Sequence, residues 1–350
     1  MGEREATFIG EPHEACLEPP TKPATYKHQP LSRSLDEIRL IKLRREKEGP
    51  VRCEIQAFPL KRAPKYIALS YRWGSPLLLH NIFIGDQTLE IRDILNSCLL
   101  ELREDVHTWL WIDQICIAQA DTTERNHQVG MMSRIYSNAT SVIIWLSDVP
   151  LAPPGEVDHF NDQNLDDLSV VTLLRNSYFT RLWIIQEVLL AKQVRFHLNG
   201  NRCFTWDTLS DAYCDLDWGL KESASIPTAS RSLMANRGVF GMRPRLHWTK
   251  LIDGFSANAC VDPRDKVYGM MGVVVKEERS TVDYNKSVAE VFFDVMYALA
   301  PPDTKDRRVL ERAFYKLGPQ MSIDLSLIRN SEWLFNLEFN LTESGVACKV

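Results

Sequence analysis

The stretch TWLWIDQICIAQADTTERNHQVGMMSRIYSNATSVIIWLSD, residues 108–148, decides the fold class of this 350-residue chain. Its apolar run 109–117, interrupted by the carboxylate of Asp113, is typical of a strand buried on both faces. Apolar residues at three- and four-residue steps over 121–139 predict a helix, and the run 141–146 predicts a second strand. Strand, helix and strand in this order indicate one crossover of a parallel sheet. We therefore predict an α/β fold with Asp113 near the carboxyl edge of a strand.

Composition narrows the class of protein. The hydrophobic fraction of 45% is ample for a buried core, and the formal net charge of −5 argues against a nucleic-acid partner. No apolar run approaches the ~20 residues of a membrane span, and the first residues lack the apolar core of a secretory signal. The eight cysteines are scattered without a CxxC pair, so no metal site is expected. We expect a cytoplasmic protein without a membrane span.

A second informative stretch is YIALSYRWGSP, residues 66–76. Residues 66–71 predict a buried strand, and Ser70, Arg72 and Trp73 gather where that strand ends. Open α/β sheets place their ligand loops at such strand ends, so these three residues and Asp113 are candidate substrate-binding residues. The alternative is that Trp73 plugs the top of the sheet while Arg72 pairs with a surface acid. The residues alone leave both interpretations open.

The third informative stretch, YFTRLWIIQEVLLAKQVRFHL, covers residues 178–198. Apolar residues at helical spacing predict a helix, and the alternation over 193–199 predicts a half-buried strand. Trp183 and Glu187 lie one turn apart, so they are expected to project together. A single glutamate on a helix usually faces solvent, but Glu187 has apolar neighbours and a tryptophan beside it. These surroundings favour a pocket position for its carboxylate.

The chain divides by composition into four parts. Residues 1–34 are polar and proline-rich, and we predict a disordered leader there. Residues 35–200 contain the α/β pattern, whereas 201–318 are largely helical in pattern. Residues 319–350 have no firm pattern and stay unassigned.

The three stretches, in this order, closely resemble the heterokaryon-incompatibility (HET) domain of filamentous fungi. The motifs that carry the resemblance are YIALSYRWGSP (66–76), the run 110–148 and RLWIIQEVLLAK (181–192). The downstream segments DPRDKVYGMMGV (262–273) and VDYNKSVAEVFFDVMYALA (282–300) are also similar to the region that follows this domain in the family. One departure is CIAQ at 116–119, where the family usually has CINQ. Three long motifs in order make the match specific.

The resemblance implies a role in non-self recognition between fungal strains that ends in programmed cell death. HET domains are thought to be remotely similar to TIR domains, which have a flavodoxin-like parallel sheet flanked by helices. Some TIR domains cleave NAD with a glutamate on a helix that also carries a tryptophan. By motif position, Glu187 would be the catalytic residue and Trp183 its substrate-binding neighbour. NAD would then be a substrate, and no cofactor is implied.

Three functions compete at this point. The first is a cell-death effector with NAD glycohydrolase activity at Glu187. The second is a non-enzymatic signalling module that associates with itself or with another incompatibility protein; Asp113 and Glu187 would then have structural or interface roles. The third is a hydrolase that uses Cys116 and His127, which the apolar surroundings of Cys116 disfavour. No glycine-rich nucleotide motif supports a Rossmann redox site or a P-loop.

Overall fold

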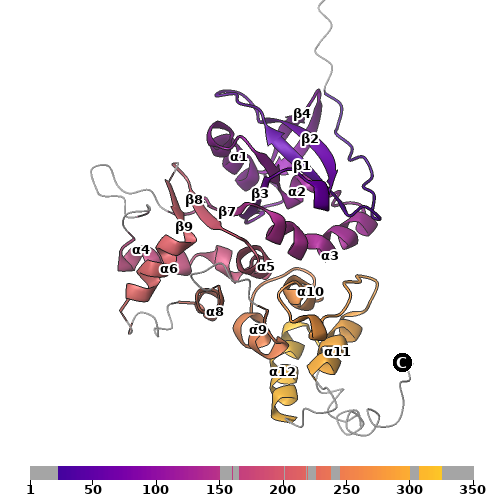
Figure 1. The fold of residues 1–350 in the computed structure, drawn as a ribbon, viewed down its shortest axis with the longest axis vertical. Helices are drawn as coiled ribbons and strands as arrows, with labels where there is room; N and C mark the ends of the chain where they lie inside the picture. Colours follow the sequence, from indigo (N-terminus) through magenta and orange to yellow (C-terminus); the bar gives the residue numbers. More distant parts are fainter. Residues whose placement is uncertain are drawn as a thin grey trace, which may run out of the picture.

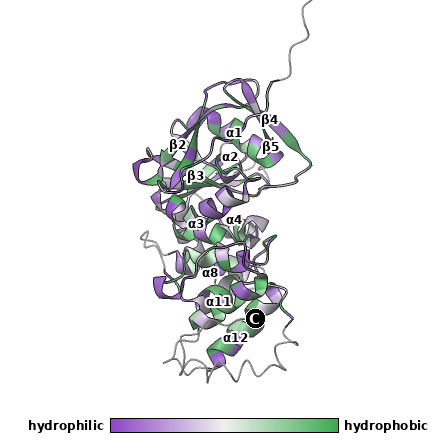
Figure 2. Cartoon of the chain, turned by 90° about the vertical axis from the view of Figure 1, so that its right-hand side faces the viewer, coloured by the Kyte–Doolittle hydropathy of each residue, from purple (hydrophilic) through white to green (hydrophobic). Residues whose placement is uncertain are grey.

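The computed structural model describes residues 23–149, 160, 165–200, 202–217, 219, 226–237, 245–299 and 307–324. An α/β part built on one large sheet lies at one end of an elongated molecule, and the C-terminal helices lie at the other end (Figure 1, Figure 2). The α/β fold and the mostly helical C-terminal region predicted from the sequence are confirmed.

The sheet is mixed, and its centre is parallel. Its order is β5-β4-β2-β1-β6-β3-β7-β8-β9, and the four strands β6, β3, β7 and β8 run parallel to one another. In chain order these four follow the pattern 2-1-3-4, as in flavodoxin-like doubly wound sheets. The described strands are β1 (Glu37–Leu43), β2 (Arg52–Pro59), β3 (Tyr66–Tyr71), β4 (Leu79–Ile84), β5 (Gln87–Arg92), β6 (Trp109–Trp111), β7 (Ser141–Leu146), β8 (Val194–Leu198) and β9 (Arg202–Thr205).

Helices cover the sheet and build the C-terminal part. Helix α5 packs against α3 on one side and against α8 and α10 on the other, so it lies where the two parts of the molecule meet (Figure 1). Both colours of Figure 2 alternate along α11 and α12, as expected of amphipathic helices. The described helices are α1 (Asp93–Asp105), α2 (Asp113–Cys116), α3 (Thr122–Asn138), α4 (Asp167–Leu174), α5 (Ile184–Leu189), α6 (Trp206–Asp215), α8 (Thr228–Asn236), α9 (Trp248–Phe255), α10 (Asp265–Met271), α11 (Val288–Leu299) and α12 (Arg307–Gln320).

Residues 108–148, whose pattern predicted the fold class, fold largely as expected. Strands β6 and β7 both pair in parallel with β3, and every residue of β7 is buried. Helix α3 begins where expected, because the Asp121 carboxylate accepts hydrogen bonds from the backbone N–H groups of Thr123 and Glu124. One expectation was wrong: the apolar run does not continue the strand beyond Trp111. The backbone instead turns into α2, and the Ile112 carbonyl accepts hydrogen bonds from the N–H groups of the next turn.

The predicted leader is ordered in its second part. Residues 1–22 lie outside the described residues, as do 325–350 of the unassigned tail. Residues 23–34, which the sequence placed in a disordered leader, contact the outer edge of β5 near Thr25 and then reach Ile115 and Arg39. The Tyr26 N–H donates to the Thr88 carbonyl, and the Thr88 N–H donates to the Ala24 carbonyl, both at 2.8 Å. These bonds satisfy backbone groups of an edge strand that would otherwise face solvent.

Candidate functional site

A buried carboxylate lies close to the carboxyl ends of the parallel strands. Glu187 points from α5 toward β3, where the Ser70 hydroxyl donates a hydrogen bond to its Oε2 atom. The Tyr178 hydroxyl lies 2.5 Å from Ser70 Oγ. Since the single Ser70 proton is directed to the carboxylate, Tyr178 donates to Ser70. Ser70, Tyr178 and Glu187 are only 1%, 0% and 3% exposed, so this hydrogen-bonded chain is closed to solvent.

The environment of Glu187 makes its carboxyl group titrate near neutral pH. Burial raises the pKa of Glu187 to about 7. The Arg181 guanidinium and the Ser70 hydroxyl oppose this rise, whereas the charge of Asp113 adds to it. A carboxyl group with such a displaced pKa at the end of a parallel sheet is a candidate for acid–base or charge-stabilising chemistry.

Trp73 and Asp113 form a second contact at the same end of the sheet. Asp113 begins α2 directly after β6, and the Trp73 indole N–H donates to its Oδ2 atom at 2.7 Å. Burial raises the pKa of Asp113, although the indole and the charge of Arg181 both favour its ionised form. The Arg92 guanidinium lies over the Trp73 ring, 4.9 Å from its centre, so a cation–π contact also holds the indole.

Arg72 ties together the ends of two strands. Its Nη2 atom donates to Asp148 Oδ2 at 2.7 Å, and its Nη1 atom donates to Ser177 Oγ at 2.6 Å. Arg72 follows β3 and Asp148 follows β7, and the strand order reverses between these two neighbours. In doubly wound sheets this reversal opens the crevice that takes the ligand. Here the ion pair between Arg72 and Asp148 spans it.

The structure separates Trp183 from Glu187. Trp183 precedes α5, and its indole is near Asp265 on α10, where it favours the ionised form of that carboxyl group. Burial raises the pKa of Asp265 to about 6, and the Tyr284 hydroxyl lies 2.5 Å from its Oδ1 atom. Glu187 faces the sheet, whereas Trp183 faces the helical part. Trp183 has a helical backbone at the start of α5, so the two side chains are distinguished by their different partners and not by a break in the helix.

Three residues of the site were not singled out from the sequence. Arg181 donates to the Tyr71 carbonyl, and its charge favours the ionised forms of Glu187 and Asp113. Tyr178 reaches Ser70. The Tyr136 hydroxyl donates to the Leu69 carbonyl at 3.4 Å and favours the ionised form of Glu187. Arg181 lies in the RLW motif beside Trp183, which is the one sequence feature that pointed toward it.

The Cys116 and His127 pair has no support as a hydrolase site. Cys116 is 0% exposed, and burial raises the pKa of its thiol to about 12, so the nucleophilic thiolate is disfavoured. His127 lies 3.4 Å from Asp36 instead. Among the described residues, no three His, Cys, Asp or Glu side chains are grouped so as to hold a metal ion. Nor does any described helix have the length and apolar character to cross a bilayer.

These features define an α/β protein with a buried carboxylate near the carboxyl ends of its parallel strands. Residues 66–187 match the family model for heterokaryon incompatibility protein (HET), and this range begins at β3 and ends at Glu187. This part of the chain is therefore similar to a HET domain, the family that the three motifs predicted.

Two curated proteins are similar to this chain. "Heterokaryon incompatibility protein 6, OR allele" of Neurospora crassa is 27% identical over 73% of this chain and 50% of its own length. "Vegetative incompatibility protein HET-E-1" of Podospora anserina is 22% identical over 44% of this chain and 11% of its own length. The chain thus spans about half of the first relative and about a tenth of the second. No solved structure matches it.

Proposed function

We propose that this chain acts in fungal heterokaryon incompatibility as an effector of non-self recognition and cell death. The names of both similar proteins support the general role, and the HET domain supplies the part of the chain that would perform it. The single observation that carries a chemical mechanism is the buried Glu187 carboxyl group, whose pKa of about 7 keeps it ready to ionise at neutral pH.

The activity that we propose for this centre is cleavage of NAD. The bond between ribose C1′ and the nicotinamide nitrogen breaks, and nicotinamide leaves as a neutral molecule with the bonding electron pair. Water adds its oxygen to C1′ and releases a proton, which gives ADP-ribose. An ionised Glu187 would stabilise the positive charge that develops on the ribose, and Ser70 would orient the carboxylate. Trp73 would supply an aromatic wall and Arg72 a phosphate contact.

Access to Glu187 requires a change in the closed structure. The carboxylate is 3% exposed, and α5 is held between α3 and the helices α8 and α10. We propose that association of HET domains shifts α5 and admits NAD. Nicotinamide release should then rise more steeply than in proportion to protein concentration. Equal activity per molecule in dilute and concentrated samples would contradict regulation by association.

A second candidate function is a non-enzymatic self-association module. It is favoured by the full set of hydrogen bonds around Glu187, because such a buried network can also serve a structural purpose. In that case, the protein would cause cell death when it is expressed in cells, and the purified, folded protein would not cleave NAD. Cell killing by a variant that lacks the Glu187 carboxylate separates the two candidates.

The stability of the folded protein should depend on the ionisation of Glu187. Its pKa rises from 4.5 to about 7 on folding, so below pH 4.5 both states carry the proton and the contribution to stability is complete. As the pH rises from 4.5 to 7, the unfolded state ionises first, and about 3 kcal/mol of stability is lost. Urea unfolding at pH 5 and pH 8 measures this loss. A Glu187→Gln variant should lack this fall in the free energy of unfolding between pH 5 and pH 8. The same fall in both proteins would show that Glu187 does not cause it.

A further inference from the structure

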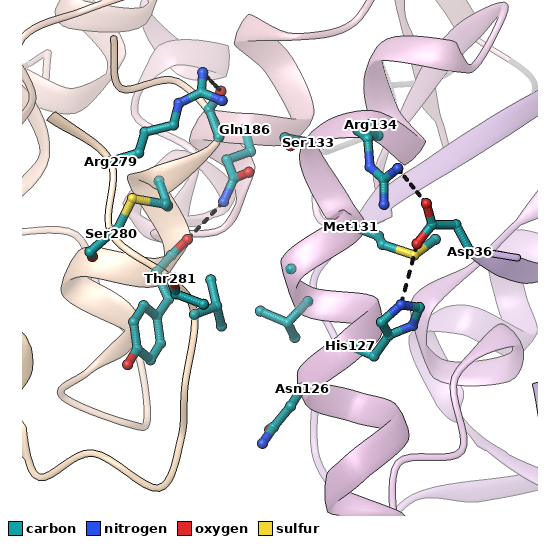
Figure 3. A pocket seen from close by; sticks show the side chains of 16 residues that line it. Asp36, Asn126, His127, Met131, Ser133, Arg134, Gln186, Arg279, Ser280 and Thr281 are labelled. Atoms are coloured by element: carbon teal, nitrogen blue, oxygen red, sulfur yellow. Dashed lines mark hydrogen bonds and ion pairs between the residues drawn. The ribbon is translucent and has the colours of Figure 1, made fainter. Parts of the chain in front are cut away.

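A cleft lies between α3 and the segment 279–282, with a volume of about 440 Å³ (Figure 3). Gln186 of α5 forms part of its floor, and the amide nitrogen of this side chain donates to the Tyr268 carbonyl at 3.0 Å. Neither Ser70 nor Glu187 lines the cleft, so it is distinct from the carboxylate centre described above. Its volume falls within the range of sites that hold small organic ligands.

Three polar atoms of residues that line the cleft have no hydrogen-bond partner in the part of the chain that the structure describes. Asn126 Oδ1, His127 Nδ1 and Ser280 Oγ are buried and make no hydrogen bond with any described residue. Native structures leave few buried polar atoms unpaired, because each costs the lost hydration of that atom. Figure 3 shows Asn126 and His127 on α3 and Ser280 on the segment across from it. All three atoms belong to residues that line the cleft, but they lie behind its surface, so a polar ligand reaches them only if side chains of the walls move.

The charges in the cleft favour an anion. Among the described residues that line the cleft, Arg134 and Arg279 contribute two guanidinium groups and Asp36 the single carboxylate. Asp36 Oδ2 pairs with Arg134 Nη1 at 2.7 Å, and Asp36 Oδ1 lies 3.4 Å from His127 Nε2. Arg279 donates from Nε to the Val274 carbonyl at 2.8 Å, and its Nη1 atom bonds to none of the described residues. Arg279 thus keeps donors available for an anionic group.

Gly130 keeps the α3 wall of the cleft open. A Cβ atom built at Gly130 would meet no atom within 4 Å, so close packing does not require glycine there. A glycine inside a helix weakens that helix relative to alanine, and α3 continues on both sides of it. Gly272 on the opposite wall differs, because a Cβ atom there would collide with Gln186 Oε1. A side chain at position 130 would therefore extend into open space beside the residues that line the cleft.

We propose that this cleft binds a small phosphorylated organic molecule, a phosphomonoester of a nucleoside or a sugar. The guanidinium groups of Arg134 and Arg279 and the hydroxyl groups of Ser280 and Thr281 suit a phosphate. The remaining organic part would contact the apolar side chains that share the walls, namely Val129, Met131, Met271 and Val282. This inference does not depend on NAD cleavage at Glu187.

Titration calorimetry of the full chain with adenosine 5′-monophosphate, ribose 5-phosphate and inorganic phosphate tests the proposal. The matched variants are Gly130→Ala and Gly130→Phe, since both remove the glycine but only phenylalanine fills the space. We expect the alanine variant to bind as the wild type does and to melt at a higher temperature. The phenylalanine variant should lose binding with its fold intact. Arg279→Gln should weaken binding at least about tenfold, because it removes charge-assisted hydrogen bonds.

The three probes distinguish the sources of the phosphate. Tighter binding of the nucleotide supports a nucleoside phosphate, and equal binding of both organic probes supports the shared sugar phosphate. Binding of inorganic phosphate as tightly as either organic probe would overturn the organic class. Binding that survives Gly130→Phe would place the ligand elsewhere and also overturn the proposal. So would the absence of binding by all three probes to a folded wild type at 10 mM, roughly the weak limit of measurable affinity.

Discussion

A Glu187→Gln variant is expected to lose nicotinamide release from NAD by about 10²- to 10³-fold while remaining folded. Glutamine preserves the shape of the side chain and can still accept the Ser70 hydrogen bond through its carbonyl oxygen. It cannot supply the negative charge that stabilises a cationic ribose, and removal of one such electrostatic contribution typically costs this much in rate. Because the wild-type carboxyl group has a pKa of about 7, the activity of the wild type should also rise as the pH passes through 7.

The control for this variant is Glu104→Gln, which removes an exposed carboxylate at the end of α1. We expect it to keep the wild-type rate and the wild-type unfolding curve. The measurement is nicotinamide release by both variants and the wild type at one protein concentration at which the wild type is active. A Glu187→Gln protein with an undiminished rate would remove Glu187 from the reaction. Cell killing that persists in this variant would favour the self-association module.

The parallel centre of the sheet was predictable because each of its strands is specified by a short, continuous segment of the sequence. Strands buried on both faces appear as short, continuous apolar runs, and β3 and β7 match such runs residue for residue. The helix between β6 and β7 carries its own start signal at Asp121. The arrangement of the outer strands was only partly predictable from the sequence, because the pairing of β1 with β6 joins segments far apart in the chain.

The composition of the site was only partly predictable. Ser70 and Glu187 are 117 positions apart; Ser70 was a candidate from its place at a strand end, and Glu187 from the resemblance of its motif. Trp73 and Asp113 were candidates on the same ground and do contact each other. The helical spacing of Trp183 and Glu187 did not reveal that Trp183 is near Asp265, because α10 is far from it in the sequence.

The ordered segment 23–34 shows how tertiary contacts override composition. Proline and polar residues there predicted disorder, yet this segment is held at the sheet by groups from elsewhere in the chain. The Gln29 carbonyl accepts a hydrogen bond of 2.5 Å from Arg39 on β1. Arg39 also donates to the Cys116 carbonyl at 2.9 Å, so one guanidinium group joins three segments. No local pattern in the sequence reveals such a partner.

An Arg39→Met variant is therefore expected to lose about 3–5 kcal/mol of stability, because it leaves a buried carboxylate without its partner. Arg39 and Glu124 are 3% and 8% exposed, and their side chains form two hydrogen bonds of 2.6 and 2.8 Å. Burial by itself raises the pKa of Glu124, but Arg39 and the Ala118 N–H outweigh burial and hold it below its usual value. The carboxylate thus stabilises the fold above pH 4.5, and this contribution is lost as the pH falls through the lowered pKa.

Urea unfolding of three proteins beside the wild type at pH 7 measures this effect. The exposed pair of Arg52 and Glu46, 3.4 Å apart, supplies the matched control, and Arg52→Met should cost less than about 1 kcal/mol. The double variant Arg39→Met with Glu124→Leu should regain part of the loss, because it removes the unpaired charge as well. A single Arg39→Met variant as stable as the control would show that the pair does not hold β1 against α3. If the double variant is no more stable than Arg39→Met, the lost stability comes from the hydrogen bonds of Arg39 to the carbonyls of Gln29 and Cys116.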